Sequence, residues 1–452
     1  MCCPDCVNPT LSSFTDSAIS AKQVGFGLPE HLDVRYKSLR LGRFTVRFFY
    51  PRSCNVLLLN AEFTPYLTRE LAQFGTCNYL PSSRIVIMRP RFLFWLVIYL
   101  MRTSRFAANL AAFLKSSQIP VLVTMDSLDS QIPTMNHKVS LLEEASKLVP
   151  QTDFISIQHG QELRRFSQEG DSKLKRVTLL CFGQWAAENF PKFGRRENKY
   201  IPVGALINSL YLRARPADIE KSCELTVIST IKDEEWWGSI IGERRAGYER
   251  LVSFVRQFCI DRMITPLVAL TIDRDSNQVL DESIIERQWF IERLGPQLRF
   301  TEPSLIFGGL SGLDERGIVP KSPKERFSTY FASDSSVVTI GMSSTALWES
   351  FSRGNRILAV NLTNNPIYDF PIEGIWSMRQ PTYEDFESRL TTIIQMQDAE
   401  WESASRDFRE FLITSDATES VTERIRLHVG SAIEESPWKK KLCINSRGTA
   451  CV

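Results

Sequence analysis

Residues 337–354, VVTIGMSSTALWESFSRG, contain the unit from which the fold can be inferred. The first four residues are all β-branched and predict a buried strand. Gly341, Ser343 and Ser344 then form a turn, and Thr345 opens a predicted helix that ends at Gly354. A buried strand that leads directly into a helix is the repeating unit of a parallel sheet.

The same alternation recurs before and after this unit. Short apolar runs are separated by stretches of helical period, such as residues 105–115 and 139–148. Strands that are apolar throughout, with helices between them, predict parallel sheets covered on both faces. We therefore expect an α/β fold of two doubly wound Rossmann-like domains that face a cleft, with C-terminal helices. The predicted strands are residues 56–59, 84–88, 121–124, 154–157, 178–182, 200–203, 224–229, 267–272, 298–300, 337–340 and 357–361.

A change in composition divides the chain into segments. Residues 208–220 are of mixed polarity and contain Pro216, and they separate two blocks of alternating strands and helices. At 452 residues the chain is too long for one ordinary core, which agrees with two domains. The expected segments are an irregular N-terminal arm (1–50), a first Rossmann-like domain (51–207), a linker (208–222), a second Rossmann-like domain (223–385), C-terminal helices (386–435) and a tail (436–452).

The composition is that of a soluble globular protein, with 43% hydrophobic and 23% charged residues. The formal net charge of +2 provides no global field that would draw the chain to nucleic acid, so a bound anion needs a local site. The ten cysteines are scattered, and Cys3 and Cys6 have no second pair nearby. We therefore predict reduced thiols in a cytoplasmic protein and neither a disulfide framework nor a zinc site.

Ligands of open parallel sheets bind at the carboxyl ends of the strands, where helix N-termini point toward them. At the end of strand 337–340, Gly341 allows a ligand to approach the backbone closely. Ser343, Ser344 and Thr345 present hydroxyl and N–H groups at a helix start, which suit a phosphate. Glu349 lies one helical turn further along the same face, within reach of a ribose hydroxyl. The alternative is an ordinary N-cap, since Ser and Thr are common capping residues.

A second candidate turn, Gln158-His159-Gly160, directly follows strand 154–157. An imidazole with an ordinary pKa near 6.5 can take a proton from a hydroxyl or donate a hydrogen bond to a leaving phosphate. Asp126, just past strand 121–124, is the candidate to orient His159 or to bind an acceptor hydroxyl. The alternatives are a histidine that only satisfies the turn backbone and an aspartate that is an ordinary turn residue.

Two basic residues follow strands of the second block, Lys232 and Arg274, and either could stabilise a departing phosphate. Solvated loop charges are the alternative. The tripeptide Asp273-Arg274-Asp275 has the form by which some transferases hold a divalent cation. It lies in the second block, whereas those enzymes carry the nucleotide site in one N-terminal domain, so no metal is predicted.

These segments resemble a known family, the bacterial surface carbohydrate biosynthesis proteins. Residues 154–160, FISIQHG, are similar to its strand-and-turn motif, which follows an aspartate-containing strand end, here residues 124–126. Residues 344–350, STALWES, with RGNR at 353–356 and FPIEGIW at 370–376, resemble its second conserved region. The sequence departs from the family pattern at His159, where many members have Asn, at Leu347-Trp348, which replaces Gly-Tyr, and at Asn355, which replaces Lys.

The resemblance implies a two-domain, glycosyltransferase-B-like transferase. It implies a nucleotide-linked donor on the second domain, with Ser344, Thr345 and Glu349 at its phosphate and ribose, and His159 near the reacting centre. We expect a metal-independent glycosyltransferase of surface polysaccharide synthesis, without a cofactor because the nucleotide-sugar is a substrate. Its expected partners are that donor and a glycan or lipid-linked acceptor held by the first domain, without nucleic acid. A polyol-phosphate transferase, a nucleotide-sugar epimerase and a non-catalytic scaffold of a glycan-assembly complex are the alternatives.

The most apolar run, residues 92–101, is flanked by Arg89, Arg91 and Arg102. As a helix its ten residues rise about 15 Å, half the hydrocarbon thickness, so the run is too short to span a bilayer. A buried helix is the favoured interpretation. The alternative is a surface that docks a lipid-linked acceptor, with the arginines at the head groups and the protein at the inner face of the membrane.

Overall fold

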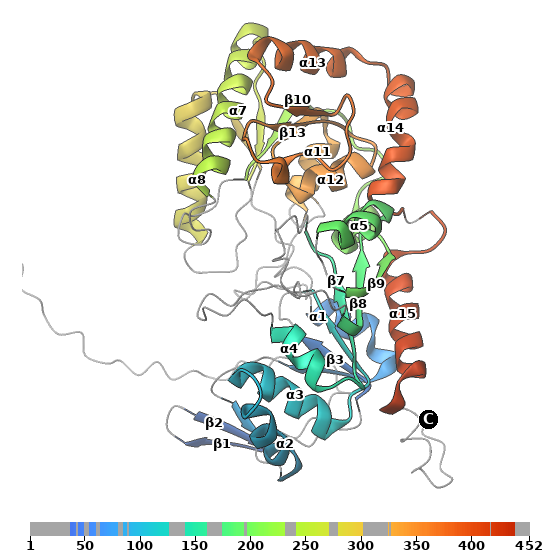
Figure 1. Ribbon diagram of the computed structural model, residues 1–452. Coiled ribbons are helices and arrows are strands. Elements are labelled where there is room, and N and C mark those ends of the chain that lie inside the picture. The colour runs from blue at the N-terminus through green and yellow to red at the C-terminus, as the bar shows by residue number, and fades with distance from the viewer. Residues whose placement is uncertain are drawn as a thin grey trace, which may run out of the picture.

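The computed structural model describes residues 37–41, 44–48, 54–59, 64–79, 85–87, 90–125, 141–160, 174–193, 197–230, 241–270, 279–301, 324, 327–415 and 417–438. Two lobes stand one above the other in Figure 1, and each contains a six-stranded parallel sheet flanked by helices.

The sheet of the first lobe has the strand order β4-β3-β6-β7-β8-β9, and all five pairings are parallel. Thr124 pairs with both Leu59 and Ser156, so the three central strands end at the same level. The strands are β3 (Val56–Leu59), β4 (Thr76–Tyr79), β6 (Val121–Thr124), β7 (Asp153–Ile157), β8 (Leu174–Cys181) and β9 (Glu197–Pro202).

Alternate residues of these strands pack on opposite faces of the sheet, as the two-residue period of a strand requires. Val56 and Leu58 belong to a core that includes α15, whereas Leu57 and Leu59 belong to the core beneath α2, α3 and α4. Both faces are therefore covered, which explains why β3 is apolar at every position. The helices of this lobe are α1 (Thr64–Glu70), α2 (Pro90–Leu100), α3 (Arg105–Ser117), α4 (Leu141–Leu148), α5 (Gln184–Asn189), α6 (Leu206–Ala214) and α15 (Val421–Glu435), with short 3-10 turns at Ala72–Phe74 and Pro191–Phe193.

The second sheet has the order β12-β11-β10-β13-β14-β15, again with every pairing parallel. Its strands are β10 (Cys223–Ile228), β11 (Leu267–Ala269), β12 (Arg299–Phe300), β13 (Ser336–Gly341), β14 (Arg356–Asn361) and β15 (Ser377–Arg379). Its helices are α7 (Ile241–Arg262), α8 (Val279–Leu294), α11 (Ser328–Asp334), α12 (Thr345–Ser352), α13 (Tyr383–Gln395) and α14 (Asp398–Leu412), with a 3-10 turn at Pro366–Tyr368. The predicted fold class, two doubly wound Rossmann-like domains with C-terminal helices, is confirmed.

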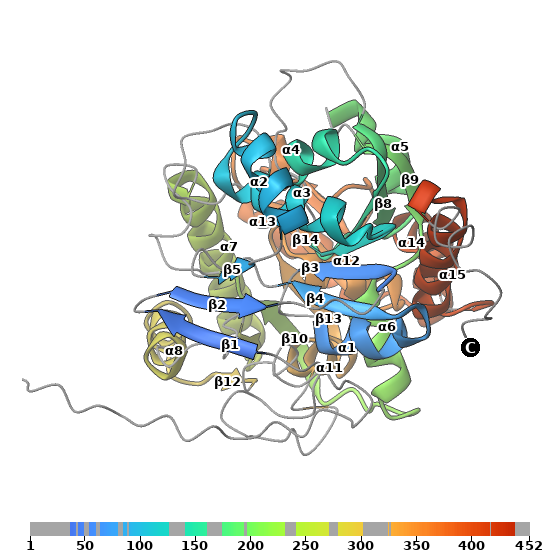
Figure 2. The same cartoon turned by 90° about the horizontal axis from the view of Figure 1, so that it is seen from below.

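The structure differs from the expected segments at both ends of the first domain. Residues 37–48, expected within an irregular arm, form the antiparallel strands β1 (Lys37–Leu41) and β2 (Phe44–Phe48). They make a separate sheet with β5 (Ile85–Ile87), a predicted strand, at the outer end of the lobe (Figure 2). The expected linker 208–222 begins inside α6, whose residues Asn208, Ser209 and Tyr211 are buried.

The two lobes share one continuous apolar core beside the strand ends. Trp185 of α5 stacks edge-on against Trp348 of α12, with ring centroids 5.4 Å apart. At Gly183 a side chain is excluded, because a Cβ there would lie 2.4 Å from the carbonyl oxygen of Leu412 at the end of α14. The chain then passes from α14 in the second lobe to α15, which runs along the first lobe (Figure 1). The lobes are therefore held together on the side of α5, α14 and α15.

Candidate functional site

The histidine turn of the first lobe and the serine-threonine turn of the second lobe meet. Gln158-His159-Gly160 directly follows β7, and residues 342–344 connect β13 to α12. A Cβ built on Gly160 would lie 3.5 Å from Thr345 Oγ1, an ordinary van der Waals distance. His159 is exposed, and Ser343, Ser344 and Thr345 are half-buried. The carboxyl end of a strand from each sheet therefore contributes to one place between the lobes.

Gln158 holds the histidine turn in shape. Its buried side-chain amide donates from Nε2 to the carbonyl oxygen of Gly160 over 2.7 Å, and its Oε1 accepts a 2.8 Å bond from the backbone N–H of Phe182. Its own backbone N–H donates to Leu180 on the neighbouring strand. Because both ends of the amide are engaged, Gln158 positions the turn and leaves His159 as its exposed member.

The serine-threonine turn has a constrained backbone. Ser343 has φ +47°, in the left-handed region that non-glycine residues seldom adopt. Ser344 occupies the N-cap position of α12, but its side chain makes no capping hydrogen bond. Ordinary capping therefore does not account for this hydroxyl, which lies half-buried at the helix start.

Gly341, the last residue of β13, is closely packed. A Cβ there would lie 3.1 Å from Leu347 Cδ1 and 3.4 Å from Ile228 Cβ, so a larger residue would require Leu347 of α12 to shift by a few tenths of an ångström. Its predicted role in the close approach of a ligand stays a prediction.

Arg244, in the first turn of α7, is a cation at this site that sequence reasoning missed. Its Nη2 donates to the carbonyl oxygen of Ser343 over 3.2 Å, and its guanidinium carbon lies 6.0 Å from the ring centroid of Tyr368. Burial lowers the pKa of Arg244 from its ordinary value. Nothing in the sequence distinguishes it from its neighbour Arg245, because the contact joins residues 99 positions apart.

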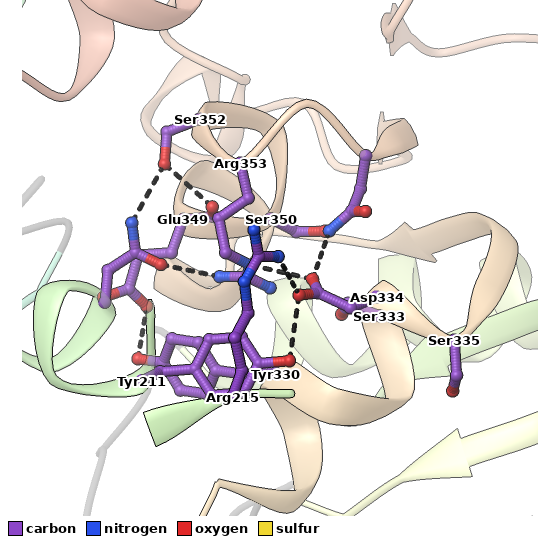
Figure 3. Close-up of polar contacts among 12 residues, drawn as sticks. Tyr211, Arg215, Tyr330, Ser333, Asp334, Ser335, Glu349, Ser350, Ser352 and Arg353 are labelled. Carbon is purple, nitrogen blue, oxygen red and sulfur yellow. Dashed lines mark hydrogen bonds and ion pairs between the residues drawn. The ribbon is translucent and has the colours of Figure 1, made fainter. Parts of the chain in front are cut away.

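Glu349 lies on α12 beneath the turn and is buried. Its Oε2 accepts a 2.7 Å hydrogen bond from the hydroxyl of Tyr330 (Figure 3). Burial raises the pKa of Glu349 to about 7, although the Tyr330 hydrogen bond and the charge of Arg353 oppose the rise. The carboxylate is thus engaged inside the lobe in this conformation, and its predicted contact with a ribose hydroxyl stays a prediction.

Asp334, at the end of α11, is the centre of a buried polar cluster (Figure 3). One carboxylate oxygen accepts from Arg353 Nε over 2.8 Å and from Asn355 Nδ2 over 2.6 Å. The other accepts from the hydroxyl of Tyr211 and from Arg215 Nη1, both over 2.9 Å. Burial by itself would raise the pKa of Asp334, but Arg353 and the hydrogen bonds hold the pKa below its usual range.

This cluster links helix α6 of the first lobe to the candidate site. Arg353 Nη1 donates to Asn208 Oδ1 over 2.8 Å, and Asn208 lies on α6. The guanidinium carbon of Arg353 also lies 5.1 Å from the ring centroid of Tyr211 and 4.9 Å from that of Tyr330. Since Tyr330 binds Glu349, the contacts continue from α6 to the helix that begins at the serine-threonine turn.

Asp126, Lys232 and Arg274 lie outside the described residues, as does the Asp273–Asp275 tripeptide. The strands that precede them end beside the strands of the two turns, since β6 pairs with β7, and β10 with both β11 and β13. Among the residues that the structure describes, no group of three or more His, Cys, Asp or Glu could hold a metal ion.

Neither a family model nor a curated protein matches this sequence. A UDP-GlcNAc 2-epimerase from Methanocaldococcus jannaschii, solved with UDP-GlcNAc and UDP, matches with a TM-score of 0.44 and 11% identity, over 83% of this chain and 99% of its own. The glycotransferase of kitacinnamycin matches at 0.43 and 10%, over 85% and 100% of the two chains. A wall teichoic acid polymerase matches at 0.41 and 9%, over 84% and 89%. At these identities and TM-scores, the likeness assigns no activity to this chain.

Proposed function

We propose that this protein transfers a sugar from a nucleotide-activated donor to an acceptor hydroxyl at the junction of its two turns. The observation that supports this most is the meeting of Gly160 and Thr345, each in the segment after a strand of a different parallel sheet. A donor and an acceptor bound to separate lobes would be brought together there, which removes much of the entropic cost of a two-substrate reaction.

On the donor side, the start of α12 favours the phosphates. The first N–H groups of a helix carry a partial positive charge, and Ser344 and Thr345 add hydroxyl groups. Arg244 lies beside the same turn through its bond to the Ser343 carbonyl. Together these groups would stabilise the negative charge that the nucleoside diphosphate gains as it leaves.

On the acceptor side, His159 is the exposed group of its turn and would act as general base. The imidazole takes the proton of the acceptor hydroxyl while the acceptor oxygen forms a bond to the anomeric carbon. The bond from that carbon to the donor phosphate breaks, and its electron pair leaves with the diphosphate. No metal or cofactor is needed for this balance.

The resemblance to bacterial surface carbohydrate biosynthesis proteins supports a glycan or lipid-linked acceptor and action on the cytoplasmic side. A polyol-phosphate transferase would use the same donor site with a different activated group. A nucleotide-sugar epimerase would convert the donor without any acceptor, so product analysis with UDP-, CDP- and CMP-linked donors separates the three.

A thermal-shift screen across nucleoside diphosphates tests the donor site. A ligand at 100 times its Kd stabilises the fold by about 2.7 kcal/mol. We expect the nucleoside diphosphates of one particular base to produce this stabilisation. Ser344→Ala should reduce the shift, whereas Ser388→Ala, at an exposed serine of α13, should not. If no nucleotide raises the melting temperature of the wild type, the prediction of a donor site at this turn is wrong.

His159→Ala separates an enzyme from a scaffold. It should keep the nucleotide-dependent shift and lower turnover about 10²-fold or more, because a general base contributes on that order. Unchanged glycan output in cells that carry this variant would favour the scaffold.

A further inference from the structure

Helix α2 is apolar on its outer as well as its inner face. Phe92 and Tyr99 are buried in the core of the first lobe. Phe94, Val97, Leu100 and Met101, which we call the α2 patch, are exposed, with Val97 at 60% and Met101 at 75%. Their spacing of three and four residues places them along one side of the helix. A surface helix of a globular protein normally carries polar residues on that side.

The α2 patch is bordered by positive charge. Arg91 precedes it, and Arg102 and Arg105 follow it, all exposed. Between Glu70 and Asp126 the sequence contains no acidic residue. The half-buried Glu144 of α4 lies nearby, and its carboxylate accepts a 2.7 Å hydrogen bond from Oγ of Ser104, which is in the turn between α2 and α3. The patch therefore combines exposed apolar side chains with exposed arginines at both ends.

The length of α2 determines how it could meet lipid. Its 11 residues rise about 16 Å, roughly half of a hydrocarbon core. No helix in the described part of the chain is both long and apolar enough to cross a membrane. A short helix with an apolar side and flanking basic residues lies in the plane of the interface. In Figure 1, α2 is at the end of the first lobe farthest from the second lobe, so a surface there leaves the two turns uncovered.

We propose that the α2 patch docks on a bilayer surface that contains anionic lipids. Charge complementarity favours this occupant over a second copy of the chain. A two-fold contact between two α2 patches would bring the arginines of one copy against those of the other, whereas lipid phosphates attract them. The inference goes beyond the proposed transfer reaction, because it concerns attachment and can be measured without any substrate.

Sedimentation of the full chain with vesicles tests the apolar contact. Vesicles of phosphatidylcholine with 30% phosphatidylglycerol should bind the wild type, and Val97→Glu should lower the partition coefficient about tenfold or more. Ile260→Glu on α7 is the matched control, since Ile260 is 59% exposed and belongs to the other lobe. It should bind as the wild type does. Circular dichroism should first show that both variants are folded. An equal loss of vesicle binding in both variants, or no loss in either, would then overturn the proposal.

A charge series tests the lipid component. Arg102→Gln should reduce binding about fivefold, the effect expected for one arginine near an anionic surface, and Arg256→Gln, at an exposed arginine of α7, should not. Binding should weaken with added salt and be much lower on pure phosphatidylcholine. Equal binding to neutral vesicles would contradict the proposal. So would a dimer in light scattering that Val97→Glu dissociates, since the occupant would then be a second copy.

Discussion

Arg353 Nε lies 2.8 Å from Asp334 Oδ1, and the two side chains are only 1% and 4% exposed. The pair joins the end of α12 to the end of α11 within the second lobe. Tyr211 and Arg215, from α6 and the residue after it, bind the other oxygen of the same carboxylate. The ion pair therefore lies within the lobe that carries the serine-threonine turn and connects it to α6 of the first lobe.

Asp334→Ala should lower the free energy of unfolding by about 3–5 kcal/mol. Removing one partner of a buried pair leaves the other charge desolvated and unpaired, and here Arg353 would be that charge. Urea denaturation measures the effect. Asp398→Ala removes a fully exposed carboxylate from its pair with Arg356 and should leave the urea midpoint unchanged. Equal midpoints for wild type and Asp334→Ala would contradict a stabilising role for the cluster.

Glu349→Gln should change how stability depends on pH. The pKa of Glu349 is raised to about 7, so between about pH 4.5 and 7 the folded state binds more protons than the unfolded state. The stability of the wild type therefore falls as pH rises through this window, by at most about 3 kcal/mol from this group. Glutamine does not titrate and can still accept the Tyr330 hydrogen bond. The variant should thus gain stability relative to wild type as pH rises.

Glu402→Gln should change the pH dependence of stability in the opposite direction. Hydrogen bonds from Arg409 and Arg406 lower the pKa of Glu402, so its contribution is present above its unfolded pKa and is lost as pH falls. This variant should be less stable than wild type at neutral pH, with the difference shrinking in acid. Melting temperatures of the three proteins from pH 3 to 8 measure both effects, since the Glu402 effect lies below about pH 4.5 and the Glu349 effect above it. A constant difference between wild type and Glu349→Gln would show that Glu349 does not titrate in this window.

The sequence predicts the strands that are buried on both faces, together with the edge strands β9 and β12, and misses the edge strands β4 and β15. Val56–Leu59 is apolar at every position because both faces of β3 are covered. Thr76–Tyr79 and Ser377–Arg379 lie at the edges of their sheets, are short and contain polar residues, so they carry no such pattern. The strands of residues 37–48 also lie outside the two main sheets, and their charges follow no clear period.

For the candidate site, local spacing predicted the two turns but not their surroundings. The position of His159 after a strand follows from the pattern of residues 154–160 alone. By contrast, the spacing of Glu349 to Thr345 predicts that it faces a ligand, whereas its buried carboxylate accepts a hydrogen bond from Tyr330, 19 residues earlier on another helix. Arg244 reaches Ser343 across 99 residues. Such contacts depend on packing between elements, which a single sequence does not encode locally.

Gly160→Leu should impair function without unfolding the protein. A Cβ at Gly160 meets Thr345 Oγ1 at an ordinary contact distance, so Gly160→Ala should be tolerated. A leucine would extend further and obstruct the space where the two turns meet, so nucleotide-dependent stabilisation and turnover should both fall. Gly242→Leu is the control, because a Cβ there meets nothing within 4 Å. Full activity of Gly160→Leu would show that the reaction occurs elsewhere.

Arg244→Ala should weaken nucleotide binding about tenfold. The arginine bonds the carbonyl oxygen of Ser343, a residue held at φ +47°, and it adds a positive charge beside the predicted phosphate site. Arg245 is the matched control, since it is the next residue on α7 and pairs instead with Glu249 over 3.4 Å. Isothermal titration calorimetry with the most stabilising nucleotide should show a raised Kd for Arg244→Ala and an unchanged one for Arg245→Ala.

Arg244→Lys would retain the charge but lose the planar guanidinium. Partial recovery of nucleotide affinity would assign the effect to charge, whereas no recovery would assign it to the Ser343 contact. An unchanged Kd in Arg244→Ala would place the phosphates away from this turn.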